Sequence, residues 1–214
     1  MLPIIWVEEW DVDRRLGELD LSREELIEVI RACVAAHGGC TDNDPPSAKG
    51  WEAWRWGVRR LREIYRPAGF DKDETGGLST TVNRARRYRI AVVNTDDATG
   101  LPGDRIPQNR NKKGPASEQA TTINQQLLPG YDWPRRTPDG QEPVSDLPTW
   151  HLCVYIEGDE VRAELSLLVE FKSGFFTECS ERIILIGQDD WQKLDFGDSS
   201  GDLGPEFDVD VRRK

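Results

Sequence analysis

The feature that most restricts the fold is a regular alternation of apolar and polar residues between positions 151 and 186. Along residues 161–172 every second side chain is apolar, and only Leu168 interrupts the pattern. Because successive side chains of a strand point to opposite faces, this pattern predicts a half-buried strand. Residues 151–156 alternate in the same way, and Gly158-Asp159 separates the two runs as a two-residue turn. The expected pairs are Ile156 with Val161, Val154 with Ala163 and Leu152 with Leu165.

A second hairpin is expected at Lys172-Ser173-Gly174, a three-residue loop with glycine at the left-handed position. Its register pairs Phe171 with Phe175, Leu167 with Cys179 and Ala163 with Ile183. The same register places Glu164 opposite Arg182 as a cross-strand ion pair, and Leu168 opposite Glu178. Both hairpins turn the same face inward, so we predict a three-stranded antiparallel meander over about residues 151–186.

Helix signals precede the meander. Ser22-Arg23-Glu24-Glu25 is a capping box, and it begins a helix that Gly38-Gly39 ends. A second helix is expected from about Ala48 to Arg66, where Pro67 stops it. An apolar stripe along this helix consists of Trp51, Trp54, Val58, Leu61 and Tyr65. Shorter elements are expected at residues 4–7 (an edge strand), 88–94 (a strand) and about 116–127 (a helix).

Together these elements predict an α+β fold. An antiparallel sheet built on the meander, and joined by the strand at residues 88–94, should pack against two or three helices. Residues 1–188 are expected to form a single domain, and residues 189–214 an acidic, glycine-rich C-terminal segment. Within that segment the alternation of Phe207, Val209 and Val211 allows one more edge strand, and disorder is the alternative.

Composition restricts the class of protein. The chain has 214 residues, 37% of them hydrophobic, and no run approaches the roughly 20 apolar residues that span a bilayer. The first nine residues lack the basic region of a secretory signal, so we expect a soluble, cytoplasmic protein without a membrane partner. The four cysteines follow no metal or disulfide pattern and should be reduced.

Charge is distributed unevenly along the chain. The net charge is -11, yet residues 51–118 contain 14 bases and only 9 acids. One interpretation is that these charges form solvated faces that keep the protein soluble. The other is a central site for nucleic acid or another polyanion, with acidic flanks that screen the site or bind a basic partner protein.

The basic residues of the centre fall into three groups. Four arginines share one face of the second helix, four more surround the start of the strand at residues 88–94, and the third group ends the long polar loop at residues 95–114. Guanidinium groups suit phosphate well, so we predict that the helix and strand groups form one polyanion-binding patch. The candidate residues are Arg55, Arg59, Arg62, Arg66, Arg84, Arg86, Arg87, Arg89, Arg110, Lys112 and Lys113.

Glu170-Phe171-Lys172 is the sharpest catalytic candidate, because Glu170 and Lys172 point to the same side of a strand. The pair resembles the Glu-x-Lys half of the PD-(D/E)xK nuclease motif, which implies a metal-dependent nuclease. Asp159, in the preceding turn, would be the acid available to complete the motif, but it lies eleven residues away, about 35 Å along the strand. We therefore expect no metal-dependent cleavage of DNA or RNA.

Other chemistry has weaker support in the sequence. Cys33, His37 and Cys40 lie within eight residues, but zinc would need a fourth ligand such as Cys153, so we expect no metal and no cofactor. His151 is the only base expected near Ser166 and Ser180, which share its cross-strand row. Rows of this kind mostly form hydrogen bonds, so nucleophilic catalysis is not expected.

Three hypotheses of function follow. The first, which we favour, is a non-enzymatic binding protein that engages nucleic acid or another polyanion through the central arginines. The second is the metal-dependent nuclease with Glu170 and Lys172. The third is an acidic inhibitor or immunity-type protein whose ends imitate a polyanion and occupy a basic partner.

Overall fold

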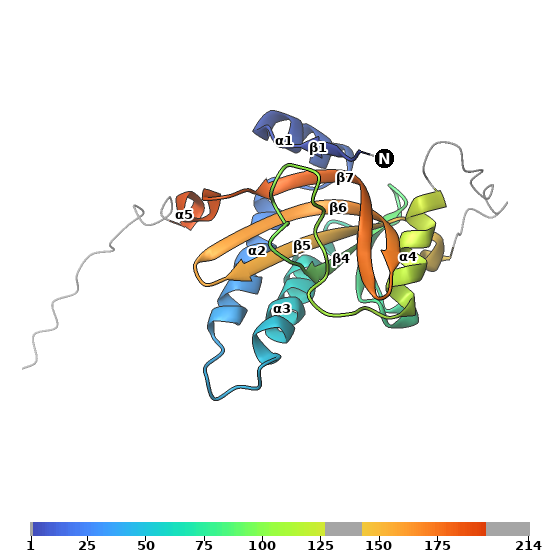
Figure 1. The fold of residues 1–214 in the computed structure, drawn as a ribbon. Coiled ribbons are helices and arrows are strands. Elements are labelled where there is room, and N and C mark those ends of the chain that lie inside the picture. The colour runs from blue at the N-terminus through green and yellow to red at the C-terminus, as the bar shows by residue number, and fades with distance from the viewer. Residues whose placement is uncertain (1, 127–142, 196–214) are drawn as a thin grey trace, which may run out of the picture.

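The computed structural model describes residues 2–126 and 143–195, which form a seven-stranded sheet with helices on both sides (Figure 1). The strand order is β1-β7-β6-β5-β4-β3-β2. The strands are β1 (Ile4–Trp6), β2 (Asp71–Asp73), β3 (Thr80–Asn83), β4 (Tyr88–Asn94), β5 (Thr149–Glu157), β6 (Glu160–Lys172) and β7 (Phe175–Ile186). The helices are α1 (Glu9–Glu18), α2 (Arg23–Gly38), α3 (Ala48–Tyr65), α4 (Pro115–Gln126) and α5 (Asp190–Asp195).

The α+β class is confirmed, but the sheet is larger than the predicted meander and it is mixed. β1 pairs with β7 and β4 with β5 in parallel, whereas the other neighbours are antiparallel. The expectation of an antiparallel sheet on three strands therefore needs correction. Strands β1, β2 and β3 have only three or four residues, which is too short for a periodic pattern to show in the sequence.

The register of the first predicted hairpin is confirmed, with Ile156 opposite Val161 and Leu152 opposite Leu165. The register of the second is wrong. Lys172 pairs with Phe175 across a two-residue turn, in which Ser173 (φ 54°) and Gly174 (φ 95°) are both left-handed. Four register shifts then follow along β6 and β7, so Cys179 faces Leu168, Glu178 faces Glu170 and Ile183 faces Leu165. Each bulge changes the offset between the strands, and a uniform register cannot anticipate it.

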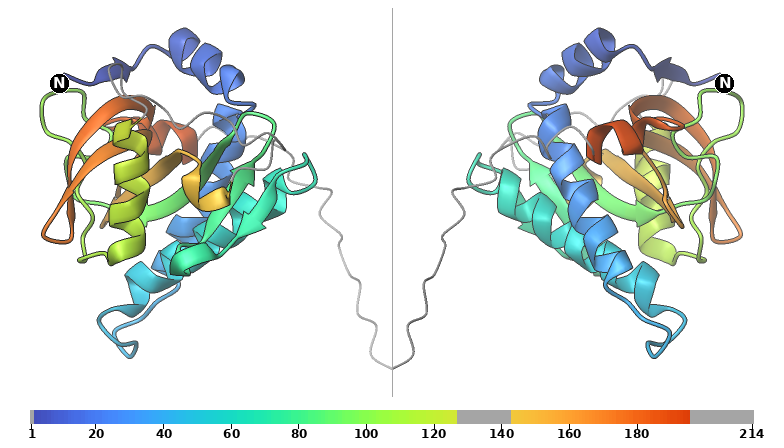
Figure 2. Two further views of the ribbon diagram at one scale, coloured as in Figure 1. Left: turned by 90° about the vertical axis from the view of Figure 1, so that its right-hand side faces the viewer. Right: turned by 90° about the vertical axis from the view of Figure 1, so that its left-hand side faces the viewer.

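Helices α2 and α3 cover one face of the sheet, while α4 and the loop at residues 95–114 lie on the other (Figure 2). The serine half of the predicted capping box is present, because the Ser22 hydroxyl accepts the Glu25 N–H. Asn124 fixes α4 to the strands: its side chain donates to the Thr149 and Leu168 carbonyls and accepts the Thr149 N–H, each at 2.7–2.8 Å. The first part of the expected acidic segment forms α5, which packs on the core, and residues 196–214, including Phe207, Val209 and Val211, lie outside the described residues.

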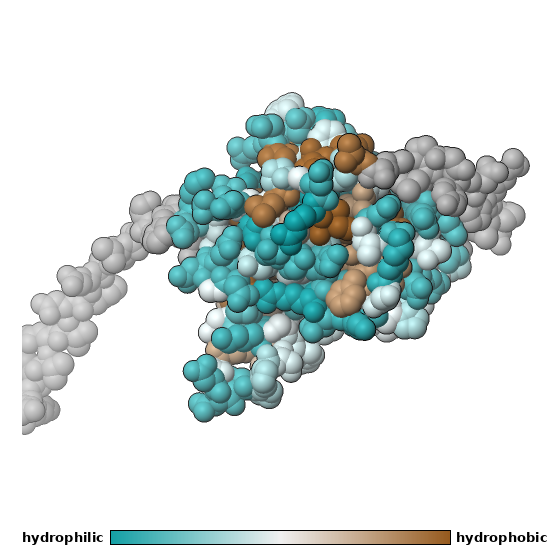
Figure 3. Space-filling model, in the orientation of Figure 1, coloured by the Kyte–Doolittle hydropathy of each residue, from teal (hydrophilic) through white to brown (hydrophobic). Residues whose placement is uncertain are grey.

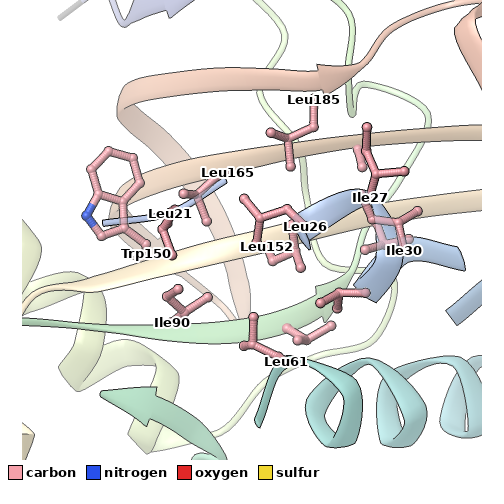
Figure 4. Close-up of a cluster of buried hydrophobic side chains, with 14 of the residues drawn as sticks. Leu21, Leu26, Ile27, Ile30, Leu61, Ile90, Trp150, Leu152, Leu165 and Leu185 are labelled. Atoms are coloured by element: carbon pink, nitrogen blue, oxygen red, sulfur yellow. The ribbon is translucent and has the colours of Figure 1, made fainter. Parts of the chain in front are cut away.

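The main core lies between the sheet and helices α2 and α3 (Figure 4). Leu26 and Ile30 of α2 and Leu61 of α3 meet Leu152 and Leu165 of the sheet. At Gly57 the packing is so close that a Cβ atom would lie 2.6 Å from the Cys33 sulfur and 3.0 Å from Val92. Glycine therefore lets α3 approach β4, and this approach places the half-buried Trp54 beside the strand.

The predicted tryptophan stripe on α3 is only partly core. Val58, Leu61 and Tyr65 are buried, but Trp51 is 54% exposed. The other large hydrophobic side chains that are exposed in residues 2–126 and 143–195 are Leu2, Ile4, Val7 and Trp10, all near the N-terminus. In the view of Figure 3 hydrophilic residues dominate, and apolar ones gather in the upper part, where β1 and β7 lie. No helix among the described residues combines the length and apolar character needed to cross a bilayer.

The face opposite α2 and α3 is organised by a buried ion pair. Glu164 and Arg182, both 0% exposed, approach to 2.6 Å. The expected pair is thus present, although Ile184, not Arg182, lies directly opposite Glu164. Arg182 also donates to the carbonyls of Ala98, Gly103 and Arg105, and Glu164 accepts the Gly100 N–H at 2.7 Å. These bonds hold the loop at residues 95–114 flat against the sheet.

Arg182→Ala should lower the free energy of unfolding by about 3–5 kcal/mol, because it leaves the Glu164 carboxylate buried without a counter-ion. Urea unfolding followed by circular dichroism measures the change. Lys172→Ala removes an exposed ion pair and is the control, which should leave stability nearly unchanged. A loss of less than about 1 kcal/mol in Arg182→Ala would mean that the pair does not hold the loop.

Candidate functional site

A cavity of about 250 Å³ lies between β4, the loop that follows β2 and the start of α4. We call it the α4 pocket and define it by Trp54, Gly76, Gly77, Lys113, His151 and Phe176. With residues 91–93 of β4, its lining comes from six separate parts of the chain. Lys113 belongs to the predicted cations and His151 was considered as a base, but the glycines, Trp54 and Phe176 were not predicted as site residues.

Lys113 lies immediately before α4 and lines the pocket. Its N–H donates to the Gly174 carbonyl at 3.0 Å, and this bond ties the start of the helix to the turn between β6 and β7. Burial lowers the pKa of its ammonium group, and no acidic partner compensates that burial in residues 2–126 and 143–195. Lys113 is therefore a partly buried cation whose charge is not neutralised.

The first turn of α4 forms another wall. Gly114 and Pro115 begin the helix, and proline suits this position because the N–H that it lacks would have no helical partner. In α4 Pro115 has no N–H and the Ser117 N–H donates to the Gly114 carbonyl at 3.1 Å, so the Ala116 N–H and the helix dipole remain to favour a bound anion. The start of α4 and Lys113 thus present positive charge to the same cavity.

Gly76 and Gly77 form the wall opposite α4. Both have left-handed backbones, with φ of 69° and 81°, and a Cβ atom on Gly76 would lie 3.6 Å from the Ala116 Cβ. Ion pairing of Arg62 with Glu74 at 2.7 Å and a hydrogen bond from Ser79 to the same carboxylate hold the loop in place. Because glycine has no side chain, this wall presents backbone to the cavity. Other residues at these two positions would add side chains to the wall.

His151 lines the pocket and is only 2% exposed. Burial, followed by the charges of Arg89 and Lys113, lowers the pKa of its imidazole to about 3, so the ring is neutral at physiological pH. Within residues 2–126 and 143–195 neither ring nitrogen has a partner in hydrogen-bond geometry, although the Thr149 backbone acts weakly on the pKa of the ring and the ring packs against Phe176 with 4.9 Å between centroids. A neutral imidazole offers one donor and one acceptor, and both are unused here.

The serines expected near His151 do not bond to it. Ser166 lies opposite His151 in the sheet, but its hydroxyl donates to Glu164. The expected position of Ser180 in the row is taken by Arg182, and the Ser180 hydroxyl donates to the Leu167 carbonyl. No nucleophile and base are therefore joined by a hydrogen bond at this point of the described structure.

The predicted arginines are largely neutralised by neighbouring acids. Pairs within 2.6–2.8 Å are Arg55 with Glu52, Arg59 with Glu63, Arg62 with Glu74, Arg84 with Asp71, Arg86 with Asp20, and Arg110 with Glu157. Arg89 is buried and donates to Thr149 and to the Ser145 carbonyl, and Arg87 lies in the turn between β3 and β4. Arg66 and Lys112 are exposed and have no acidic partner in residues 2–126 and 143–195. Of the whole predicted set, only Lys113 lines the α4 pocket.

Glu170 and Lys172 pair with each other on the surface at 2.8 Å, and the Thr177 hydroxyl also donates to Glu170. The Lys172 bond is the main cause that lowers the pKa of the Glu170 carboxyl. Asp159 lies in the turn at the opposite end of β6, and Glu178 faces Glu170. Within the described residues no group of three or more Cys, His, Asp or Glu could hold a metal ion.

Cys33, His37 and Cys40, which the sequence places close together, belong to no possible metal-binding group within the described residues. All four cysteines are free thiols, and burial raises the pKa of Cys33 to about 12. A second, larger hollow of about 550 Å³ contains His37, Lys49 and Arg110, but Glu157 also lines it and pairs with Arg110. The α4 pocket therefore differs from the rest of the described surface in combining an unpaired cation with an unpaired buried imidazole.

Comparison with known proteins adds no family to this geometry. No family model matches the chain, and neither a curated protein nor a solved structure gives a significant match. Function has to be inferred from the residues of the α4 pocket themselves.

The neutral state of His151 predicts a pH dependence of stability. The folded pKa of about 3 lies below the unfolded value, so the unfolded chain binds more protons between about pH 3 and 6.5 and stability falls as the pH falls through this window. His151→Leu should remove up to about 1.4 kcal/mol per pH unit of this slope. Urea unfolding of both proteins at pH 7, 6 and 5 measures it, and parallel slopes would contradict the buried, neutral imidazole.

Proposed function

We propose that the protein is a non-enzymatic binding protein whose ligand carries an anionic group, and that this group binds in the α4 pocket. The observation that carries the proposal is Lys113, a partly buried ammonium group beside the first turn of α4 that has no acidic partner among the described residues. Withdrawing a cation from water costs free energy, and a nearby negative charge offsets this cost and favours the charged form. A phosphate or carboxylate in the pocket would supply that charge.

The surface arginines are a less favourable site for the same anion. Six of them already contact a carboxylate, so a phosphate would have to displace an existing partner. Arg62 in particular also donates to the Asp73 and Thr80 carbonyls, which gives it a role in the fold. We therefore retain the anionic ligand of the sequence hypothesis, but we propose that it binds at Lys113 and not at the surface arginines.

The lining of the pocket favours binding over catalysis. His151 and Lys113 are the only titratable side chains that line it in the described part of the chain. An imidazole with a pKa of about 3 is a weak base at physiological pH, although it still forms hydrogen bonds. No observation specifically favours the nuclease, and most of the acidic segment behind the inhibitor hypothesis lies outside the described residues.

The proposal predicts that Lys113→Met weakens binding of inorganic phosphate at least tenfold, because it removes the unpaired charge from the cavity. Isothermal titration calorimetry at fixed ionic strength measures the affinity. Lys112→Met is the matched control, since this neighbouring cation is exposed and does not line the pocket. Equal losses in the two variants would indicate unspecific attraction, and an unchanged affinity in Lys113→Met would place the anion elsewhere.

A further inference from the structure

The lining of the α4 pocket is largely apolar and would contact more of a ligand than an anionic group. Beside Lys113 and the start of α4, its walls include the apolar side chains of Trp54, Leu78, Val93 and Phe176. Inorganic anions gain nothing from such walls, whereas burying an apolar ligand surface is favourable. The lining therefore points to a ligand with an apolar body as well as an anionic group.

The size of the cavity restricts that body. At about 250 Å³ it exceeds the roughly 150 Å³ of an engineered cavity that holds a benzene ring. One ring with one small anionic group fits such a volume, whereas a chain of nucleotides does not. A flat body is further favoured because the wall includes the half-buried ring of Trp54. Phe176, which is only 1% exposed, packs against His151 and Phe171 with ring centroids 4.9 Å and 5.6 Å apart and completes the apolar wall behind it.

His151 adds a requirement for a polar substituent. Both of its ring nitrogens are buried and have no hydrogen-bond partner in the described part of the chain. A buried polar group without a hydrogen bond is destabilising, and a ligand that supplies the bond removes this penalty. This unsatisfied side chain is independent of the helix terminus and of Lys113, yet it lines the same cavity.

We propose that the ligand of the α4 pocket is a small molecule built on a single aromatic ring, which carries one anionic group and one hydrogen-bonding substituent. The anionic group lies at Lys113 and the start of α4, the ring lies against the aromatic and aliphatic walls, and the substituent bonds to His151. This inference rests on the proposed anion-binding function. A phosphate monoester and a carboxylate share the required chemistry.

The test is calorimetry on the full-length protein with inorganic phosphate, phenyl phosphate, acetate, benzoate and phenol. We expect phenyl phosphate to bind at least tenfold more tightly than phosphate, or benzoate at least tenfold more tightly than acetate. Phenol should bind more weakly than the aromatic anion that shows this difference. The pair that shows the difference identifies the anionic group. Because this series uses the unaltered chain, its result does not depend on the folding of a variant.

The outcomes separate the inference from the function on which it rests. If inorganic phosphate binds as tightly as phenyl phosphate, and acetate as tightly as benzoate, the ring is not recognised and the inference is overturned, while the anion-binding function stands. If phenol binds as tightly as the aromatic anions, the charge is not recognised and the anion-binding function is overturned. If none of the five compounds binds, both are overturned.

Two variants locate the ring and the substituent. Trp54→Leu should reduce the affinity for the aromatic anion to that of its counterpart without the ring. Trp51→Leu, a change at an exposed position outside the pocket, should leave both affinities unchanged. A hydroxyl group on the ligand's ring should strengthen binding to the unaltered protein, but it should not strengthen binding to the His151→Leu variant. An effect of Trp51→Leu equal to that of Trp54→Leu, or a hydroxyl effect that survives in His151→Leu, would contradict the proposed placement.

Discussion

The buried ion pair of Glu164 and Arg182 is the interaction on which the far side of the sheet depends. Such a pair is stable only when every remaining donor and acceptor is satisfied. Here the backbone of residues 98–105 satisfies them, so an irregular loop becomes a fixed layer of the protein. The end of the same loop is tied to the turn between β6 and β7 by Asn109 and by the backbone of Lys113. The site of the unpaired cation is thus set by a charge pair in the sheet and by the hydrogen bonds that follow it along the loop.

Local patterns predicted the parts of the fold that depend on neighbouring residues. The alternation at residues 151–172, the Gly158-Asp159 turn and the Ser22 cap each involve groups a few positions apart, and the structure contains all three. The second hairpin was predicted, but its register was wrong because bulges shift the pairing of β6 with β7. The parallel pairing of β4 with β5 joins strands separated by a long connection. Such non-local pairing leaves no periodic signal in either strand.

In the candidate site, too, local contacts could be predicted from the sequence, whereas contacts between distant residues could not. Helical spacing places Arg59 near Glu63, four residues later, but it could not show that Arg84 and Arg86 meet Asp71 and Asp20, which are distant in the sequence. Lys113 was identifiable as a cation, yet its lack of a partner depends on tertiary burial. The glycine pair at residues 76–77 and the Gly-Pro step before α4 are visible signals, although only the folded sheet brings them to His151.

The central claim is that an anion binds at the start of α4, and backbone NMR tests it most directly. Titration of the isotopically labelled protein with inorganic phosphate should shift the amide signals of Gly77, Ala116 and Ser117 most strongly, because these groups border the cavity. The arginine-bearing face of α3 and the turn at residues 84–87 should change little. Shifts concentrated at Arg59, Arg62 and residues 84–87, with none at α4, would contradict the account and return the anion site to the surface arginines.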